Sequence, residues 1–212
     1  METKVYLDYV ESGLKECCDK FFYDNSCVAK AAEYSLLNGG KRTRAIFVFL
    51  TRDMCGADWK KSLYRACGVE MIHCYSLIHD DLPCMDNDDM RRGKPSNHKV
   101  YGENMALLAG DALQALAFEV MLSEESIAKA GAQRAASAAG ILGKAIGADG
   151  MVGGQVIDLL SEGKQISLET LRKMDEGKTG ALISACVQMG CVLGGGSEKE
   201  LQAAREYADA IG

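Results

Sequence analysis

Three aspartates near the middle of the chain have the residue type and spacing to bind a divalent cation. Asp80 and Asp81 end a long apolar segment, and Asp86 follows in the loop after Pro83. We expect that loop to carry Asp86 back towards Asp80, and two carboxylates brought together repel each other unless a cation lies between them. Magnesium takes oxygen ligands, keeps several waters and is commonly shared with substrate phosphates. The segment therefore predicts a magnesium site for a phosphorylated ligand.

Two alternatives exist for this acidic segment. A calcium-binding helix–loop–helix hand needs a glycine at the sixth loop position and a glutamate at the twelfth. Counted from Asp86, those positions hold Arg91 and Asn97, so the calcium interpretation fails. A solvated acidic turn is the second alternative, and we expect Asp88 and Asp89 to belong to such a turn.

Basic residues cluster at two places in a chain whose net charge is −6. Arg91, Arg92 and Lys94 follow the aspartates directly, where guanidinium groups can bind phosphate oxygens beside metal-binding carboxylates. Residues 39–44, Gly-Gly-Lys-Arg-Thr-Arg, precede a predicted helix start, where free amides and the helix dipole favour anions; a basic surface turn is the alternative. An acidic chain with local basic clusters argues against a general nucleic-acid binder and favours a small anionic ligand.

Further polar residues lie near predicted helix junctions later in the chain. Lys178 and Thr179 could both reach a phosphate, and Gln155 and Asp158 lie about one helical turn apart. Each pair is also compatible with ordinary packing, so the pattern alone leaves both interpretations open. Together with the basic clusters, they predict two diphosphate sites, one bridged by magnesium and one bound directly by lysine and arginine. Such a pair of sites suits the joining of two diphosphates, one of which ionises.

The elements that must position these residues are predicted to be helices. Only 2 prolines occur, apolar residues recur at helical spacing, and strand signals are weak. In the predicted helix over 63–82, His73 and Leu77 share a face with Asp80. We expect one domain over residues 1–212, with a polar loop at 84–100. Helices are predicted to include residues 31–37, to begin near 43, and to cover 63–82, 102–122, 125–147, 150–160, 168–177, 179–192 and 198–212.

The cysteine pattern and the two ends of the chain lead to expectations about its setting. The 9 cysteines lack metal-site or redox spacing, which predicts free thiols in a reducing cytoplasm. No apolar run approaches the ~20 residues that span a bilayer, and the first residues lack the apolar core of a signal peptide. An apolar stripe continues to Ile211, so we expect the chain to be part of something larger.

The motifs resemble those of the trans-prenyl diphosphate synthases, in particular the bacterial farnesyl diphosphate synthase group. The one departure within them is Ala45, where the family usually has proline. The resemblance implies an all-α, isoprenoid-synthase-type helical bundle around a central cavity, with the C-terminal helices and a second aspartate-rich motif missing from this chain. The matching segments are residues 39–44, 70–86, 91–95, 110–113, 153–159 and 178–182.

The resemblance also implies a reaction and its residues. Magnesium, more than one ion per site and replaceable by manganese, would bridge the diphosphate of a dimethylallyl or geranyl substrate. The allylic cation would then alkylate isopentenyl diphosphate to give farnesyl diphosphate, and the released proton would pass to the departing diphosphate. The implied metal ligands are Asp80 and Asp86, supported by Asp81. The implied allylic diphosphate residues are Arg91, Lys178, Thr179 and Gln155. The implied isopentenyl diphosphate residues are Lys41, Arg44, His73 and Arg92.

Product length in the resembling family depends on what closes the pocket below the first aspartate. Tyr75 and Ser76 lie five and four residues before Asp80, and an aromatic floor there favours a C15 product; ordinary core packing is the alternative for Tyr75. The rival functions are a geranylgeranyl diphosphate synthase and a non-catalytic helical subunit of a heteromeric synthase. The expected assembly is a homodimer, without nucleic acid or membrane insertion.

Overall fold

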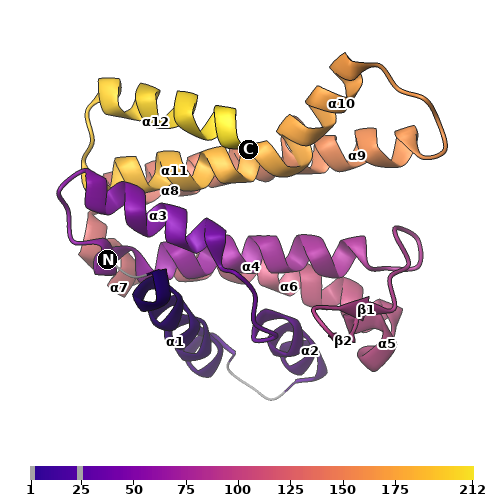
Figure 1. Ribbon diagram of the computed structural model, residues 1–212. Helices are drawn as coiled ribbons and strands as arrows, with labels where there is room; N and C mark the ends of the chain where they lie inside the picture. The colour runs from indigo at the N-terminus through magenta and orange to yellow at the C-terminus, as the bar shows by residue number, and fades with distance from the viewer. Residues whose placement is uncertain (1–2, 23–25) are drawn as a thin grey trace. The chain divides into compact units, whose positions relative to one another are not determined.

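The computed structural model describes residues 3–22 and 26–212, and most of these residues are helical (Figure 1). The all-α prediction is therefore confirmed. The chain divides into two compact units. The first comprises Met1–Ile46 and Leu63–Ser126, and the second comprises Phe47–Ser62 and Ile127–Gly212. Helices α3 (Thr43–Met54) and α7 (Glu124–Ala130) begin in the first unit and end in the second.

Two long helices, α4 (Leu63–Asp80) and α6 (Glu103–Met121), lie side by side at the centre of the first unit (Figure 1). Gly68 permits their close approach, because a Cβ at this position would lie 2.5 Å from the Met121 side chain. Every residue of α4 from 63 to 72 is buried, as expected of a helix that is covered on all sides. The remaining elements of this unit are α1 (Thr3–Phe21), α2 (Cys27–Leu36), β1 (Met90–Arg91), β2 (Lys94–Pro95) and α5 (Asn97–Tyr101).

The second unit is built around α11 (Ala181–Gly194), which packs against α8 (Ala132–Ile146) and α12 (Glu198–Ile211) (Figure 1). Ser197 and Glu200 form the capping box that begins α12, as their spacing predicts. The other elements of the unit are the 3₁₀ turn η1 (Trp59–Ser62), α9 (Met151–Ser161), α10 (Leu168–Asp175) and the π-helical turn η2 (Glu176–Gly180).

Two element predictions were wrong in part. The helix predicted over 125–147 is two helices, α7 and α8, because Gly131 adopts a φ of 85° between them, outside the helical region. The predicted polar loop over 84–100 contains an antiparallel hairpin of β1 and β2, with Arg91 paired to Lys94, and then α5. This hairpin and α5 give the cationic residues after the aspartates a defined backbone.

Within the described part of the chain, no single helix has both the length and the apolar composition to cross a membrane; α6 and α7 pass that test only as a pair, which is bent by 49°. All nine cysteines are free thiols.

Candidate functional site

The loop after α4 brings the backbones of two predicted metal ligands together. The Asp86 N–H donates to the Asp80 carbonyl oxygen at 2.9 Å, and the Asn87 N–H donates to the Leu82 carbonyl at 3.1 Å. Asn87 adopts a φ of 54°, a left-handed conformation that asparagine tolerates better than most residues. The loop therefore returns towards the end of α4, as the sequence predicts, and it presents Asp86 at an exposed position beside the half-buried Asp80.

The donor set fits magnesium better than a metal that needs a complete protein cage. Among the residues that the structure describes, no three His, Cys, Asp or Glu side chains are grouped to hold an ion. A pair of carboxylates is what a magnesium ion needs from a protein when water and substrate phosphates supply its other ligands. Asp80 and Asp86 would be that pair, a role that stays a prediction.

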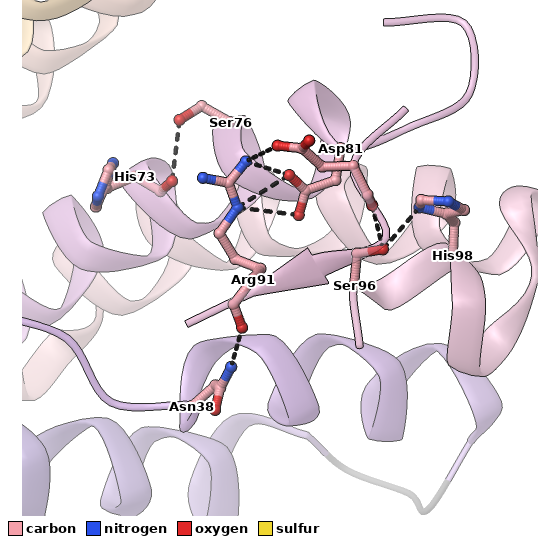
Figure 2. Close-up of polar contacts among 8 residues, drawn as sticks. Asn38, His73, Ser76, Asp81, Arg91, Ser96 and His98 are labelled. Carbon is pink, nitrogen blue, oxygen red and sulfur yellow. Dashed lines mark hydrogen bonds and ion pairs between the residues drawn. The ribbon is translucent and has the colours of Figure 1, made fainter. Parts of the chain in front are cut away.

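Asp81 has a different environment from the other two aspartates. Its side chain is only 3% exposed, and both of its oxygens accept from Arg91 Nε, at 2.9 and 3.2 Å (Figure 2). A two-oxygen contact of this kind fixes the plane of a guanidinium group as well as its position. The geometry thus makes Asp81 an anchor for Arg91, and its predicted supporting role towards the metal is untested.

Further contacts fix the backbone and the side chain of Arg91. The Asn38 amide donates to the Arg91 carbonyl oxygen at 3.2 Å, and the Asp88 carboxylate lies 3.3 Å from the guanidinium group (Figure 2). The hydrogen bonds that Arg91 donates to Asp81 are the largest cause of a raised pKa for Arg91, so this side chain keeps its positive charge. Arg91 is consequently a fixed cation at the end of α4, bound to Asp81 and Asp88.

A second group of predicted residues forms a basic cluster in the same unit. Arg44 Nη1 lies 3.3 Å from His73 Nε2, and Arg92 donates to the Gly39 carbonyl oxygen. Glycine is favoured at position 40, because the backbone there has a φ of 133°, which L side chains rarely adopt. Lys41 is exposed on the same loop. The structure therefore brings Arg44, His73 and Arg92 together around the Gly-Gly turn.

His73 is neutral in this cluster at ordinary pH. Burial, followed by the positive charges of Arg44 and Arg92, lowers its pKa to about 3. Because arginine can only donate, the Nε2 atom of His73 must accept the hydrogen bond from Arg44. The cluster thus holds its positive charge on arginines and leaves the imidazole as a neutral hydrogen-bonding group.

The low pKa of His73 predicts a pH dependence of stability. Between the unfolded value of 6.5 and the folded value of about 3, the unfolded chain binds the proton that the folded chain excludes. Stability should therefore fall as the pH drops through this window, by up to about 1.4 kcal/mol per pH unit for one proton. Urea unfolding of the wild type and His73→Gln at pH 7, 6, 5 and 4 measures this, and the variant should lose less stability. Parallel pH curves for the two proteins would contradict the prediction.

Sequence reasoning missed the role of Arg42, which lies between two predicted ligand residues. Arg42 is 3% exposed and has a φ of 49°. Its guanidinium group donates to Glu11 at 2.8 Å and to the Leu36 carbonyl at 2.7 Å, and it lies 3.5 Å from Glu70. These contacts support the turn that carries Lys41 and Arg44. The sequence feature that could have indicated a buried cation is Glu70, a carboxylate in an otherwise apolar run.

The remaining predicted ligands lie in the second unit. Lys178 and Thr179 belong to the π-helical turn η2, and such turns are frequent at functional sites. Lys178 Nζ lies 2.5 Å from Asp158 Oδ2 on α9, so these two predicted residues form an ion pair. The contact requires Gly154, because a Cβ there would lie 2.0 Å from the Lys178 backbone nitrogen. Thr179 is exposed and Gln155 is half-buried.

Tyr75 and Ser76, the predicted floor residues, lie on α4. Tyr75 is buried, its ring meets that of His79 edge to face with centroids 5.6 Å apart, and its hydroxyl has no hydrogen-bond partner within the described structure. The Ser76 hydroxyl donates to the His73 carbonyl at 2.9 Å within the helix (Figure 2). Tyr75 is therefore a packed aromatic residue one and a half turns below Asp80.

The fold is that of the isoprenoid synthases. A solved structure described as an FPP/GFPP synthase from Zymomonas mobilis matches with a TM-score of 0.91 and 36% identity, over 99% of this chain and 77% of that one. A geranyltransferase from Legionella pneumophila matches with a TM-score of 0.90 and 40% identity, over 99% of this chain and 74% of that one.

This chain belongs to the polyprenyl synthetase family, whose model matches residues 25–212. It is 48% identical over 188 residues to the heterodimeric geranylgeranyl pyrophosphate synthase large subunit 1 of Arabidopsis thaliana, across 87% of this chain and 51% of that protein. It is 50% identical to geranylgeranyl pyrophosphate synthase 3 of the same plant, across 87% and 52%. The chain thus spans about half the length of these curated relatives. The family prediction is confirmed, whereas the narrower farnesyl group is not.

Proposed function

We propose that this chain carries the prenyltransferase machinery of a magnesium-dependent prenyl diphosphate synthase, which joins isopentenyl diphosphate to an allylic diphosphate. The observation that carries the proposal is the presence of two groups of charged residues in the first unit. One is the aspartate loop, residues 81–89, with Arg91, and the other is the basic cluster of Arg44, His73 and Arg92. Both depend on α4, which supplies Asp80 and His73.

The proposed ligand residues fall into two sets, one for each substrate. Asp80 and Asp86 would hold magnesium, which neutralises the negative charge that develops on the departing diphosphate. Arg91, oriented by Asp81, adds a fixed cation to that side. Binding of isopentenyl diphosphate is assigned to the basic cluster and Lys41. Neutral His73 then donates or accepts a hydrogen bond without adding charge, and the departing diphosphate takes the released proton.

For the product, we propose geranylgeranyl diphosphate in place of the farnesyl diphosphate predicted from the sequence. The curated relatives compared above carry geranylgeranyl synthase names, at 48% and 50% identity. Farnesyl diphosphate is the second candidate, and the packed ring of Tyr75 below Asp80 is the observation that favours it. A homodimer is proposed as the assembly. A heterodimer is the alternative suggested by the name of one relative, and light scattering on the purified chain distinguishes the two.

An assay with labelled isopentenyl diphosphate tests this function. The protein is incubated with dimethylallyl, geranyl or farnesyl diphosphate, with and without magnesium, and the products are separated by chromatography. The assay is run on this chain and on a version extended to the length of its relatives. Magnesium-dependent condensation by the extended protein is expected, with a C20 product. The absence of any condensation would overturn the proposal, and a C15 end product would replace only the proposed chain length.

Tyr75→Ala tests the proposed floor of the product cavity. Removing the ring opens space below Asp80, so the variant should make products at least one C5 unit longer than those of the wild type. Phe21→Ala is the matched control, because it removes a buried aromatic ring that packs on Tyr64 in the same unit and leaves Tyr75 in place. Chromatography of the dephosphorylated products measures chain length. An unchanged product distribution in Tyr75→Ala would assign the residue to core packing alone.

A further inference from the structure

Ser96 is buried directly behind the aspartate loop. It is 1% exposed, and its hydroxyl donates to the Asp88 carbonyl oxygen at 2.6 Å (Figure 2). Its backbone N–H donates to the next carbonyl along, that of Asp89, at 2.9 Å. One residue therefore holds two consecutive carbonyl groups of the loop that carries Asp86.

The hydroxyl of Ser96 does not cap the helix that begins after it. Ser96 is the N-cap of α5, where a serine side chain usually accepts a hydrogen bond from the first turn of the helix. No such capping bond forms here. The helix thus forgoes an interaction that typically contributes ~1 kcal/mol, while the hydroxyl points to the aspartate loop instead.

His98 completes a directed chain of hydrogen bonds. Its Nδ1 atom lies 3.2 Å from the Ser96 hydroxyl oxygen, and its ring is buried. A serine hydroxyl has one proton, and here that proton points to a carbonyl, which can only accept. His98 must therefore donate from Nδ1, so the ring carries a proton on that atom. Each bond in such a chain polarises the next and strengthens it.

The surroundings leave Ser96 little freedom to move. A cavity of only ≈ 20 Å³ remains in this region, and its lining includes Asn38, Asp81, Arg91, Ser96 and Asn97. Such a volume is about that of one water molecule. Asn97 is also tied to α2, since its amide donates to the Ala31 carbonyl at 2.7 Å. The serine is thus part of a tightly packed polar layer below the loop.

We propose that Ser96, oriented by His98, is a positioning residue for the aspartate loop. By fixing the carbonyls of Asp88 and Asp89, it sets where Asp86 presents its carboxylate to magnesium bound to a diphosphate. The proposal rests on the proposed function, and it adds a group that touches neither metal nor substrate. Hydrogen-bonding partners of this kind typically change metal affinity or activity 10- to 100-fold when they are removed.

The tautomer of His98 is the first test, and it needs no metal. The sequence contains 3 histidines, so the imidazole signals in ¹⁵N NMR spectra can be assigned by substituting each in turn. We expect His98 to carry its proton on Nδ1 in the wild type and in Ser96→Thr, which keeps the hydroxyl. In Ser96→Ala we expect a mixture of tautomers. A wild-type His98 protonated on Nε2 alone would overturn the proposal.

Manganese binding is the second test, with inorganic pyrophosphate as the probe and electron paramagnetic resonance as the readout. Ser96→Ala should bind manganese–pyrophosphate on the order of 10-fold more weakly than the wild type, and Ser96→Thr should restore the affinity. Ser12→Ala is the control, because it also removes a serine-to-carbonyl hydrogen bond, to Tyr9 at 2.8 Å, on the exposed face of α1. Equal affinities in Ser96→Ala and Ser12→Ala would overturn the positioning role alone. No binding by the wild type would overturn it together with the proposed function.

A second pair of variants keeps Ser96 in place in case its replacement prevents folding. His98→Asn retains an amide donor close to the position of Nδ1, whereas His98→Gln moves that donor further from the backbone. We expect His98→Asn to bind manganese–pyrophosphate nearly as well as the wild type and His98→Gln to bind it more weakly. Equal binding by these two variants would contradict the directed chain.

Discussion

Asp86→Asn should lower kcat/KM for prenyl transfer on the order of 10³-fold in the extended protein, while folding is unchanged. The substitution preserves the size of an exposed side chain but removes one of the two charges that oppose the cation. Losing a group that stabilises developing charge in the transition state costs about 10²- to 10³-fold in rate, and a weakened metal site adds to that loss. Asp80→Asn should have an effect of the same size, because the two carboxylates are proposed to bind the same ions.

The matched control is Asp89→Asn on the same loop. Asp89 is exposed, and its side chain pairs with Lys99 at 2.7 Å on the surface. Exposed ion pairs contribute little to stability, and no substrate role is assigned to this one. Steady-state kinetics at several magnesium concentrations measure all three variants. If Asp86→Asn were as active as Asp89→Asn, the proposal that Asp86 binds magnesium would be contradicted.

Arg42→Met should give the largest loss of stability, about 3–5 kcal/mol in the free energy of unfolding. Arg42 is the buried cation opposite Glu70, which is itself 2% exposed. Removing one member of such a pair leaves the other charge buried without its partner, and that cost exceeds what the intact pair contributes. Glu70 would keep a neutral donor, the Ala45 N–H at 3.1 Å, in place of the Arg42 cation.

Urea denaturation followed by circular dichroism measures this loss, with an unchanged slope as the sign that the unfolded state is unaffected. Lys20→Met is the control, because Lys20 and Glu125 form an exposed ion pair in the same unit. The double variant Arg42→Met/Glu70→Gln should recover part of the lost stability, since it also removes the stranded charge. Equal unfolding free energies for Arg42→Met and Lys20→Met would show that the buried pair is dispensable.

The helical architecture was largely predictable because it depends on short-range patterns. Helices α3, α6, α9 and α12 begin within one or two residues of their predicted starts. The exceptions have local physical causes. The φ of 85° at Gly131 divides one predicted helix into two, a glycine conformation that apolar periodicity does not detect. The hairpin of β1 and β2 is only two residues long on each side, too short to show alternation.

The candidate site could be predicted from the sequence only in part. The return of Asp86 to Asp80 is local, so residue spacing and a helix-ending proline were enough to predict it. The partner of Asp81 was not predictable in the same way. Two adjacent aspartates look alike in sequence, and only the packing of the hairpin decides that one is buried against Arg91 while the other stays beside Asp86.

By itself, then, the sequence determined an all-helical chain. It also predicted a pair of carboxylates for magnesium and the cations for two diphosphates, and these roles stay predictions. These follow from residue type and spacing within single segments. Tertiary structure alone decided that Arg42 is an internal counter-ion of Glu70, and that Ser96 supports the aspartate loop instead of capping its helix. The physical reason is that a side chain's role depends on which groups burial leaves within hydrogen-bonding distance. For these residues, the partners come from other segments of the chain.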